Sequence, residues 1–339
     1  MRHRTRVALV AVIALVALAP LSAAAQSADP AGAFRTPWGD PDVQGIWANN
    51  SATPLERPDA FAGKAVLTDE ELAQLERRAA EVLDGDDAFF GDDFITAALA
   101  DDKQFRSFDT DTGNYNQFWL VDRQIENRTS LIVDPPTGKL PAMTADGEQR
   151  AVADVERLFG GRLPAGPGDL SLPVRCITFG IPNLFAGYNS NVQILQTPDH
   201  IVMWHELMHD ARVIPLDGGP HPSEDIRQWH GVSRGHWEGD TLVVETRNYS
   251  ADTRLTIPGS AAGGAHLRVI ERLRRVDADT LQWDVTFEDP VTWTEPWTAR
   301  LFVQQTEGPI FEYACHEGNY GMTGILAGAR VEERGGAGR

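Results

Sequence analysis

Cationic side chains, cysteines and long apolar segments are all scarce in this chain, and each shortage excludes a class of function. Lysines and arginines number 30 against 49 aspartates and glutamates, so the formal net charge is −19. A surface of that sign repels phosphate backbones and anionic lipid, so we expect neither nucleic acid nor membrane surfaces as partners. Two cysteines cannot build a cysteine-rich metal site. No glycine motif for phosphates occurs either, so nucleotide chemistry has no support.

The one long apolar run lies at the start of the sequence and predicts export. It spans residues 7–18, which is too short for a comfortable membrane span, and small residues follow it up to Ala25. Three arginines precede it: Arg2, Arg4 and Arg6. We expect a signal peptide over 1–25 with cleavage near Ala25. The mature chain is then periplasmic or secreted and does not insert into the membrane; a retained anchor is the alternative.

The two cysteines have two possible fates in an oxidising compartment. A bridge between Cys176 and Cys315 would close a loop of about 140 residues and restrict the unfolded chain by up to about 5 kcal/mol. Two separate buried thiols are the other interpretation. Spacing along the chain does not decide between them, because a bridge depends on the geometry of the fold.

The first half of the mature chain predicts an arm followed by helices. Residues 26–66 are rich in turn formers and leave a short strand around 45–48, so we expect an extended N-terminal arm. Region 67–165 is expected to be helical and to act as a lid. Its first helix, 68–83, begins at a capping box of Thr68 and Glu71, and a second helix covers 144–159. A strand near 129–134 ends at consecutive prolines.

Residues 166–339 predict a series of antiparallel hairpins. Alternating segments flank turn formers at 239–240, 277–279 and 307–309, and the third pair is "WTARLFVQQ" with "IFEYACHE". Successive hairpins need closure or a second layer to bury their inner faces. The sequence therefore predicts a mainly β protein: an antiparallel β-barrel or curved sandwich, lipocalin-like, with a few lid helices.

The stretch "HELMH", residues 205–209, matches the His-Glu-x-x-His form of zinc peptidases. An α-helix would stack His205 and His209 one turn apart, with Glu206 as general base. On a strand the two imidazoles would lie about 13 Å apart, too far to share one ion. The flanks "NVQILQ", "IVMW" and "ARVIPLDGG" favour the strand, and a third ligand, Glu224, is a candidate by position alone. We expect no cofactor, with zinc as the alternative.

Titratable groups in the same region supply candidates for acid–base chemistry. Strand alternation would place Glu206 and Asp210 on one face and His205 and His209 on the other, so either pair can face a barrel cavity. His209 beside Asp210 is the first choice, because an unperturbed imidazole titrates near neutrality. The full set of candidate catalytic residues is His209, Asp210, Glu206, His316 and Tyr115. A structural hydrogen-bonding role is the alternative at each position.

Aromatic and polar residues near predicted strand ends supply candidates for ligand contact. Loops at barrel mouths gather ligand groups, and aromatic rings stack against apolar ligands. The candidates are Trp204, His230, Trp119, Glu317 and Tyr320. The nine tryptophans of the chain are otherwise expected to fill the core.

Several phrases of the sequence resemble a group of exported bacterial proteins with no settled activity. They are "TPWGDPDVQGIW", "RTSLIVDPP", "LDGGPH", "SRGHWEGDTLVVET" and "FEYACHEGNYGM", and they span nearly the whole mature chain. The resemblance implies export and a shared fold. It brings no catalytic residues.

Taken together, these features predict an exported barrel that binds a small apolar or aromatic molecule. If it is an enzyme, the available groups suit a cofactor-free lyase, hydratase, isomerase or hydrolase step by acid–base catalysis. A non-catalytic periplasmic ligand-binding protein is the alternative, and a zinc metallopeptidase is the second alternative.

Overall fold

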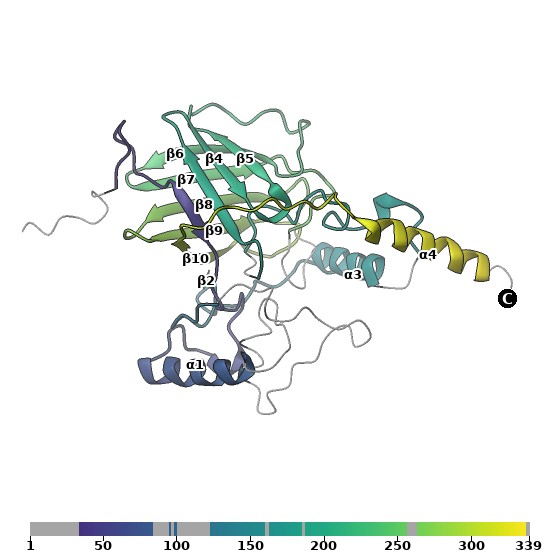
Figure 1. Cartoon of the computed structure of the whole chain (residues 1–339), viewed down its shortest axis with the longest axis horizontal. Coiled ribbons are helices and arrows are strands. Elements are labelled where there is room, and N and C mark those ends of the chain that lie inside the picture. Colours follow the sequence, from purple (N-terminus) through teal and green to yellow (C-terminus); the bar gives the residue numbers. More distant parts are fainter. Residues whose placement is uncertain are drawn as a thin grey trace, which may run out of the picture.

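An antiparallel β-sheet curled into a nearly closed barrel dominates the structure, with helices beside and below it (Figure 1). The structure is a computed structural model, and it describes residues 34–83, 95, 98–99, 123–159, 163–184, 187–255 and 263–336. The predicted fold class is therefore confirmed. The predicted signal peptide lies outside the described residues. Within them, no helix is both long and apolar enough to cross a bilayer.

Nine strands follow one another around the barrel. In spatial order they are β5 (Ala211–Pro215), β4 (His200–His205), β3 (Asn191–Gln196), β1 (Gly45–Ala48), β10 (Trp297–Gln305), β9 (Thr280–Glu288), β8 (Arg268–Arg275), β7 (Thr241–Arg247) and β6 (Val232–Glu238). A tenth, β2 (Ile132–Asp134), pairs with β10 off this path. The hairpins β6–β7 and β8–β9 and the strand at β1 were all predicted from alternation and turn residues, and they are confirmed.

The two ends of this order, β5 and β6, lie side by side but share no hydrogen-bonded ladder. Apolar contact closes this seam, together with an ion pair in which Arg234 Nη1 of β6 lies 3.6 Å from Asp217 Oδ1, just after β5. A Cβ atom added at Gly235 of β6 would lie 2.8 Å from a methyl carbon of Leu216 and 3.0 Å from one of Ile214. A larger residue at this position would require these side chains to shift, so glycine suits the close packing of the seam.

The barrel interior is filled by large apolar side chains, because alternate residues of every strand point inward. Three aromatic rings pack in the core: Phe287 stacks on Trp297 with centroids 4.4 Å apart, and Trp293 meets Trp297 edge-on at 5.4 Å. The expectation that tryptophans fill the core holds for Trp47, Trp293 and Trp297. The interior is therefore packed, as in other small barrels filled by side chains.

One ion pair crosses this interior. Arg212 of β5 donates two hydrogen bonds to the carboxylate of Glu271 on β8, and its Nη2 also lies 3.0 Å from Met203 Sδ. Both partners are almost fully buried. Burial alone would lower the pKa of Arg212, but the charge of Glu271 outweighs that effect and raises it.

The helices stand around the barrel and differ in how they are anchored. α1 (Asp69–Leu83) begins at the predicted capping box, in which Thr68 N donates to Glu71 Oε2 at 2.9 Å and Glu71 N to Thr68 Oγ1 at 3.3 Å. It forms a separate small core with Ala52, Leu67 and Ile95. α3 (Ala145–Phe159) was also predicted, and it packs at one end of the barrel through Arg150, which donates to Thr292.

The C-terminal segment departs from the sequence prediction. Residues 310–316 form no strand, so the predicted third hairpin is wrong: β10 already has β9 on one side and β1 with β2 on the other. Nor is the region 166–339 entirely barrel, because α4 (Tyr320–Gly336) follows. Residues 306–319 instead run along the outside of the barrel and lead into α4, the yellow helix of Figure 1.

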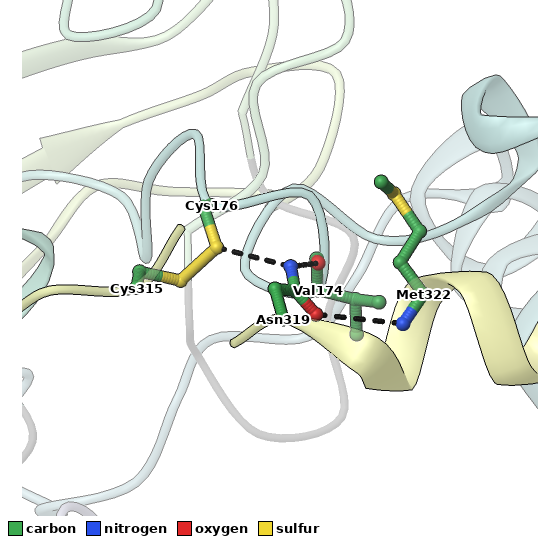
Figure 2. The surroundings of a disulfide bond; sticks show 5 residues. All are labelled: Val174, Cys176, Cys315, Asn319 and Met322. Carbon is green, nitrogen blue, oxygen red and sulfur yellow. Dashed lines mark hydrogen bonds between the residues drawn. A yellow bond between two sulfur atoms is a disulfide. The ribbon is translucent and has the colours of Figure 1, made fainter. Parts of the chain in front are cut away.

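Two contacts hold this segment in place. The backbone N–H of Phe311 donates to Glu206 Oε1 at 3.1 Å. Cys315 is bonded to Cys176, 139 residues earlier, as Figure 2 shows. The bridge, left open as one of two interpretations of the sequence, is therefore confirmed.

Removing one partner of the interior ion pair should strongly lower the stability of the folded protein. Arg212→Met leaves the carboxylate of Glu271 buried without its partner, so we expect the free energy of unfolding to fall by about 3–5 kcal/mol. Replacing both residues, as Arg212→Met with Glu271→Leu, should recover most of the loss. Urea unfolding measures both variants.

The matched control is Arg272→Met, which breaks an exposed pair with Glu238 on the outer surface. This variant should change stability little, because solvent screens exposed pairs. Equal effects of Arg212→Met and Arg272→Met would contradict a buried, mutually dependent pair.

Candidate functional site

The "HELMH" stretch is neither an α-helix nor a continuous strand. β4 ends at His205, and the chain then turns through a 3₁₀ segment, η5 (Leu207–His209). β5 returns beside β4, and His205 N donates to the Asp210 carbonyl at 2.8 Å. Met208 and His209 adopt left-handed backbone conformations, with φ of 61° and 58°. The predicted extended backbone near position 207 is therefore wrong, because the turn reverses the chain there.

This turn separates the residues that strand alternation had paired. His205 points inward and is buried, whereas His209 is exposed and meets the ring of Trp204 edge-on, with centroids 4.8 Å apart. Glu206 is buried, and its carboxylate has a structural role. It accepts hydrogen bonds from Asn191 Nδ2 at 2.6 Å and from a backbone N–H of the C-terminal segment. Among the described residues, no group of three or more His, Cys, Asp or Glu lies in position to hold a metal.

Asp210 lies at the barrel mouth together with a histidine from another loop. Its Oδ2 accepts from Thr178 Oγ1 at 3.0 Å, and His230 Nε2 lies 3.2 Å from the same oxygen. This imidazole nitrogen makes no hydrogen bond within the described residues, so the second contact is one of proximity alone. Two of the residues proposed from sequence, Asp210 and His230, are thus brought together.

Behind this pair lies a small inner cavity whose polar groups lack partners. Four buried atoms at its walls make no hydrogen bond within the described residues: His205 Nε2, Trp283 Nε1, Asn49 Oδ1 and Ser190 Oγ. The centre of a water molecule can occupy about 20 Å³ there. Since one water needs about 10–15 Å³ by this measure, the cavity suits a water or the tip of a ligand, and not a whole drug-sized molecule.

The electrostatics of the inner cavity favour neutral groups. Burial, together with the positive charges of Arg212 and His230, lowers the pKa of His205 to about 3. Tyr249 donates its hydroxyl to the Ile181 carbonyl at 3.1 Å, and burial raises the pKa of its phenol. At neutral pH His205 is therefore an uncharged imidazole, able to donate from one nitrogen and accept at the other.

A much larger groove opens beside the inner cavity, between α3 and the end of the barrel. Its volume is about 1050 Å³, at the upper end of the range of about 300–1000 Å³ typical of small-molecule sites. Phe179 contributes to the walls of both hollows and so separates them. The other walls are apolar side chains of α3, of the segment 168–175 and of the loops near the barrel end: Val152, Val155, Leu170, Leu172, Trp229 and Leu255.

Charged residues line part of the groove. Asp154 accepts from Arg157 at 3.3 Å and from Arg254 at 3.0 Å, so one carboxylate serves two guanidinium groups. Arg175 also lines the groove. Its side chain makes no hydrogen bond or ion pair with any residue that the structure describes.

Most of the other residues proposed from sequence lie away from both hollows. Tyr115 and Trp119 fall outside the described residues. His316 and Glu317 are exposed in turns before α4, and Tyr320, the first residue of that helix, is 82% exposed. Glu224 is also exposed and lines a different hollow from His205.

The groove residues were missed because they carry no shared motif. Phe179, Arg175 and Leu255 come from separate segments of the chain, and the one local signal is the glycine- and proline-rich connection after α3.

Neither a protein-family model, nor a curated protein, nor a solved structure matches this chain.

The neutral state of His205 makes stability depend on pH in a defined direction. Below about pH 6.5 the unfolded chain binds a proton at this imidazole while the folded protein does not, so acidification favours unfolding. Between pH 7 and pH 5 this group should remove about 2 kcal/mol from the free energy of unfolding. His205→Gln should lose that part of the pH dependence, which urea unfolding at the two pH values measures. An identical pH dependence in both proteins would show that His205 is not held neutral.

Proposed function

We propose that this is an exported protein that binds a small, largely apolar or aromatic molecule in the groove at the barrel mouth. One observation carries the proposal: a hollow of about 1050 Å³, walled largely by aromatic and aliphatic side chains, opens next to buried polar groups that make no hydrogen bond within the described part of the chain. Export is supported by the N-terminal sequence and by the disulfide, since disulfides persist in oxidising compartments.

The volumes favour the groove over the barrel interior as the place for the ligand body. The interior is packed with side chains, and the inner cavity has room for about one water. The groove accommodates a molecule of ordinary cofactor or metabolite size. These volumes support a ligand body beside the barrel end, with only a polar tip reaching past Phe179.

The chemistry of the walls favours an apolar or aromatic ligand. Val152 and Val155 on α3 are each 58% exposed, although they face a hollow whose other walls include Leu172 and Leu255. Burying such surface under a ligand contributes about 25 cal/mol per Å². Trp229 and Phe179 add ring faces and edges against which an aromatic ligand can pack.

Binding can be tested with the uncharged fluorescent probe N-phenyl-1-naphthylamine. We expect saturable binding to the native protein, seen as a rise in probe fluorescence and quenching of tryptophan emission. Val155→Glu places a charge in the groove wall, and it should weaken binding at least about tenfold because the carboxylate must be desolvated or displaced.

The control variant is Val331→Glu, which makes the same change at a valine of similar exposure, 59%, on a different helix, α4. It should leave binding unchanged. Absence of saturable binding, or equal weakening by both substitutions, would count against the groove as the ligand site.

Acid–base catalysis is a second candidate, and the contact between Asp210 and His230 is the observation that favours it. The carboxylate oxygen lies 3.2 Å from the imidazole nitrogen at the mouth, next to the groove through Trp229. Such a pair suits proton transfer to or from a bound molecule.

The test of catalysis is a comparison of conversion with binding. Compounds that displace the fluorescent probe are incubated with protein and analysed by mass spectrometry. Asp210→Asn should abolish any conversion while binding persists. Conversion that survives both Asp210→Asn and His230→Gln would remove the pair from the chemistry, and a lack of conversion of every binder favours the non-catalytic carrier.

A further inference from the structure

The groove has an internal asymmetry of charge that bears on the class of its ligand. We propose that the ligand is an amphipathic molecule with one oxyanion group, a carboxylate or a sulfonate, and that Arg175 binds this group while the apolar body packs against α3. This inference rests on the proposed binding function of the groove and specifies the chemistry of its ligand.

Arg175 stands out among the three arginines that line the groove. Arg157 and Arg254 share the carboxylate of Asp154, whereas the partly buried side chain of Arg175 has no polar partner within the described residues. A guanidinium group offers five donors in a planar fork that matches the two oxygens of a carboxylate. An oxyanion is therefore the group that would satisfy it.

The two remaining acidic residues of the lining do not neutralise this arginine. Glu156 and Asp252 are exposed, and the structure assigns neither an ion pair with Arg175. Solvent screens such exposed carboxylates more strongly than partly buried groups. Because the protein as a whole carries a net charge of −19, an anionic ligand needs a local cation of this kind to be held.

The wall that carries Arg175 is fixed on both sides of that residue. Asn319 donates from Nδ2 to the Val174 carbonyl and to Cys176 Sγ, both at 3.2 Å, and Cys176 is bonded to Cys315 (Figure 2). Asn319 also caps α4 by accepting from Met322 N at 3.4 Å. A guanidinium held on such a fixed segment loses less freedom on binding, which favours its use in recognition.

Two probes that share one ring system separate charge from apolar contact. N-phenyl-1-naphthylamine is uncharged, and 1-anilinonaphthalene-8-sulfonate carries a sulfonate on the same framework. The measured quantity is the change, from native protein to variant, in the ratio of the two dissociation constants, because this change cancels the intrinsic difference in hydrophobicity between the probes. In Arg175→Gln we expect the affinity for the sulfonate probe to fall about tenfold relative to the affinity for the uncharged probe, because the guanidinium contact is lost.

Two control variants show whether the effect belongs to this position. Arg175→Lys retains the charge without the planar fork and should keep part of the preference for the sulfonate probe over the uncharged probe. Arg274→Gln removes an exposed arginine on the outer surface of β8 and should leave the ratio as in the native protein. Circular dichroism of each variant verifies that the fold is retained.

The outcomes distinguish this inference from the proposed function. If the uncharged probe does not bind the native protein, the binding function of the groove fails and the inference fails with it. Suppose that both probes bind but Arg175→Gln leaves the ratio of dissociation constants unchanged, or that Arg274→Gln changes it equally. Binding in the groove then stands, and the role of Arg175 is overturned.

Discussion

The barrel depends on β1, a strand of four residues that joins two halves of the sheet. On one side it pairs with β3, and through it with β4 and β5; on the other it pairs with β10, which leads to β9, β8, β7 and β6. At the opposite seam, apolar contact at Gly235 and the ion pair between Arg234 and Asp217 close the barrel. Without β1 the two halves would lose their one backbone ladder among the described strands, and the Arg212–Glu271 side-chain pair would remain as a hydrogen-bonded link.

The same constraint positions the inner cavity, whose walls come from both halves. Trp47 belongs to β1 and Asn49 follows it directly, whereas His205 ends β4 and Trp283 lies on β9. Trp47 is 1% exposed, and its indole N–H donates to the Val43 carbonyl at 3.0 Å, which fixes the strand in the core. A cavity walled by residues that are far apart in the sequence thus requires the pairing that β1 provides.

Those parts of the fold that follow from local chemistry could be predicted from sequence. The helix at 69–83 has a reciprocal cap, and the hairpin β8–β9 alternates on both sides of a turn of aspartates, so each segment carries its own signal. The turn at 206–209 carries only a weak signal: histidine is enriched at positive φ, but Met208 is not a residue type that indicates a left-handed backbone.

Two other departures have tertiary causes. The segment "IFEYACHE" alternates like a strand, but both edges of β10 are already occupied, so it has no strand to pair with. Helix α4 contains five glycines after its first residue, which lowers its intrinsic helix propensity. Asn319, which caps it, is positioned by contacts beside the disulfide, and these become visible only in the fold.

The candidate site could be predicted only in part. Asp210 and His230 were proposed from residue type, and the structure brings them together at the mouth. The groove itself combines α3, the segment 168–175 and the loop near 252–255, and no spacing in the sequence relates these segments. The covalent bond between Cys176 and Cys315 lies directly beside Arg175 in one wall of the groove, and sequence spacing alone does not reveal that bond.

A crystal structure of the protein with bound 1-anilinonaphthalene-8-sulfonate tests the central claim most directly. The expected result is density for the ring system between α3 and Leu255, with the sulfonate at Arg175. Density inside the barrel beside Trp283, or on the exposed surface of α4 with an empty groove, would contradict it.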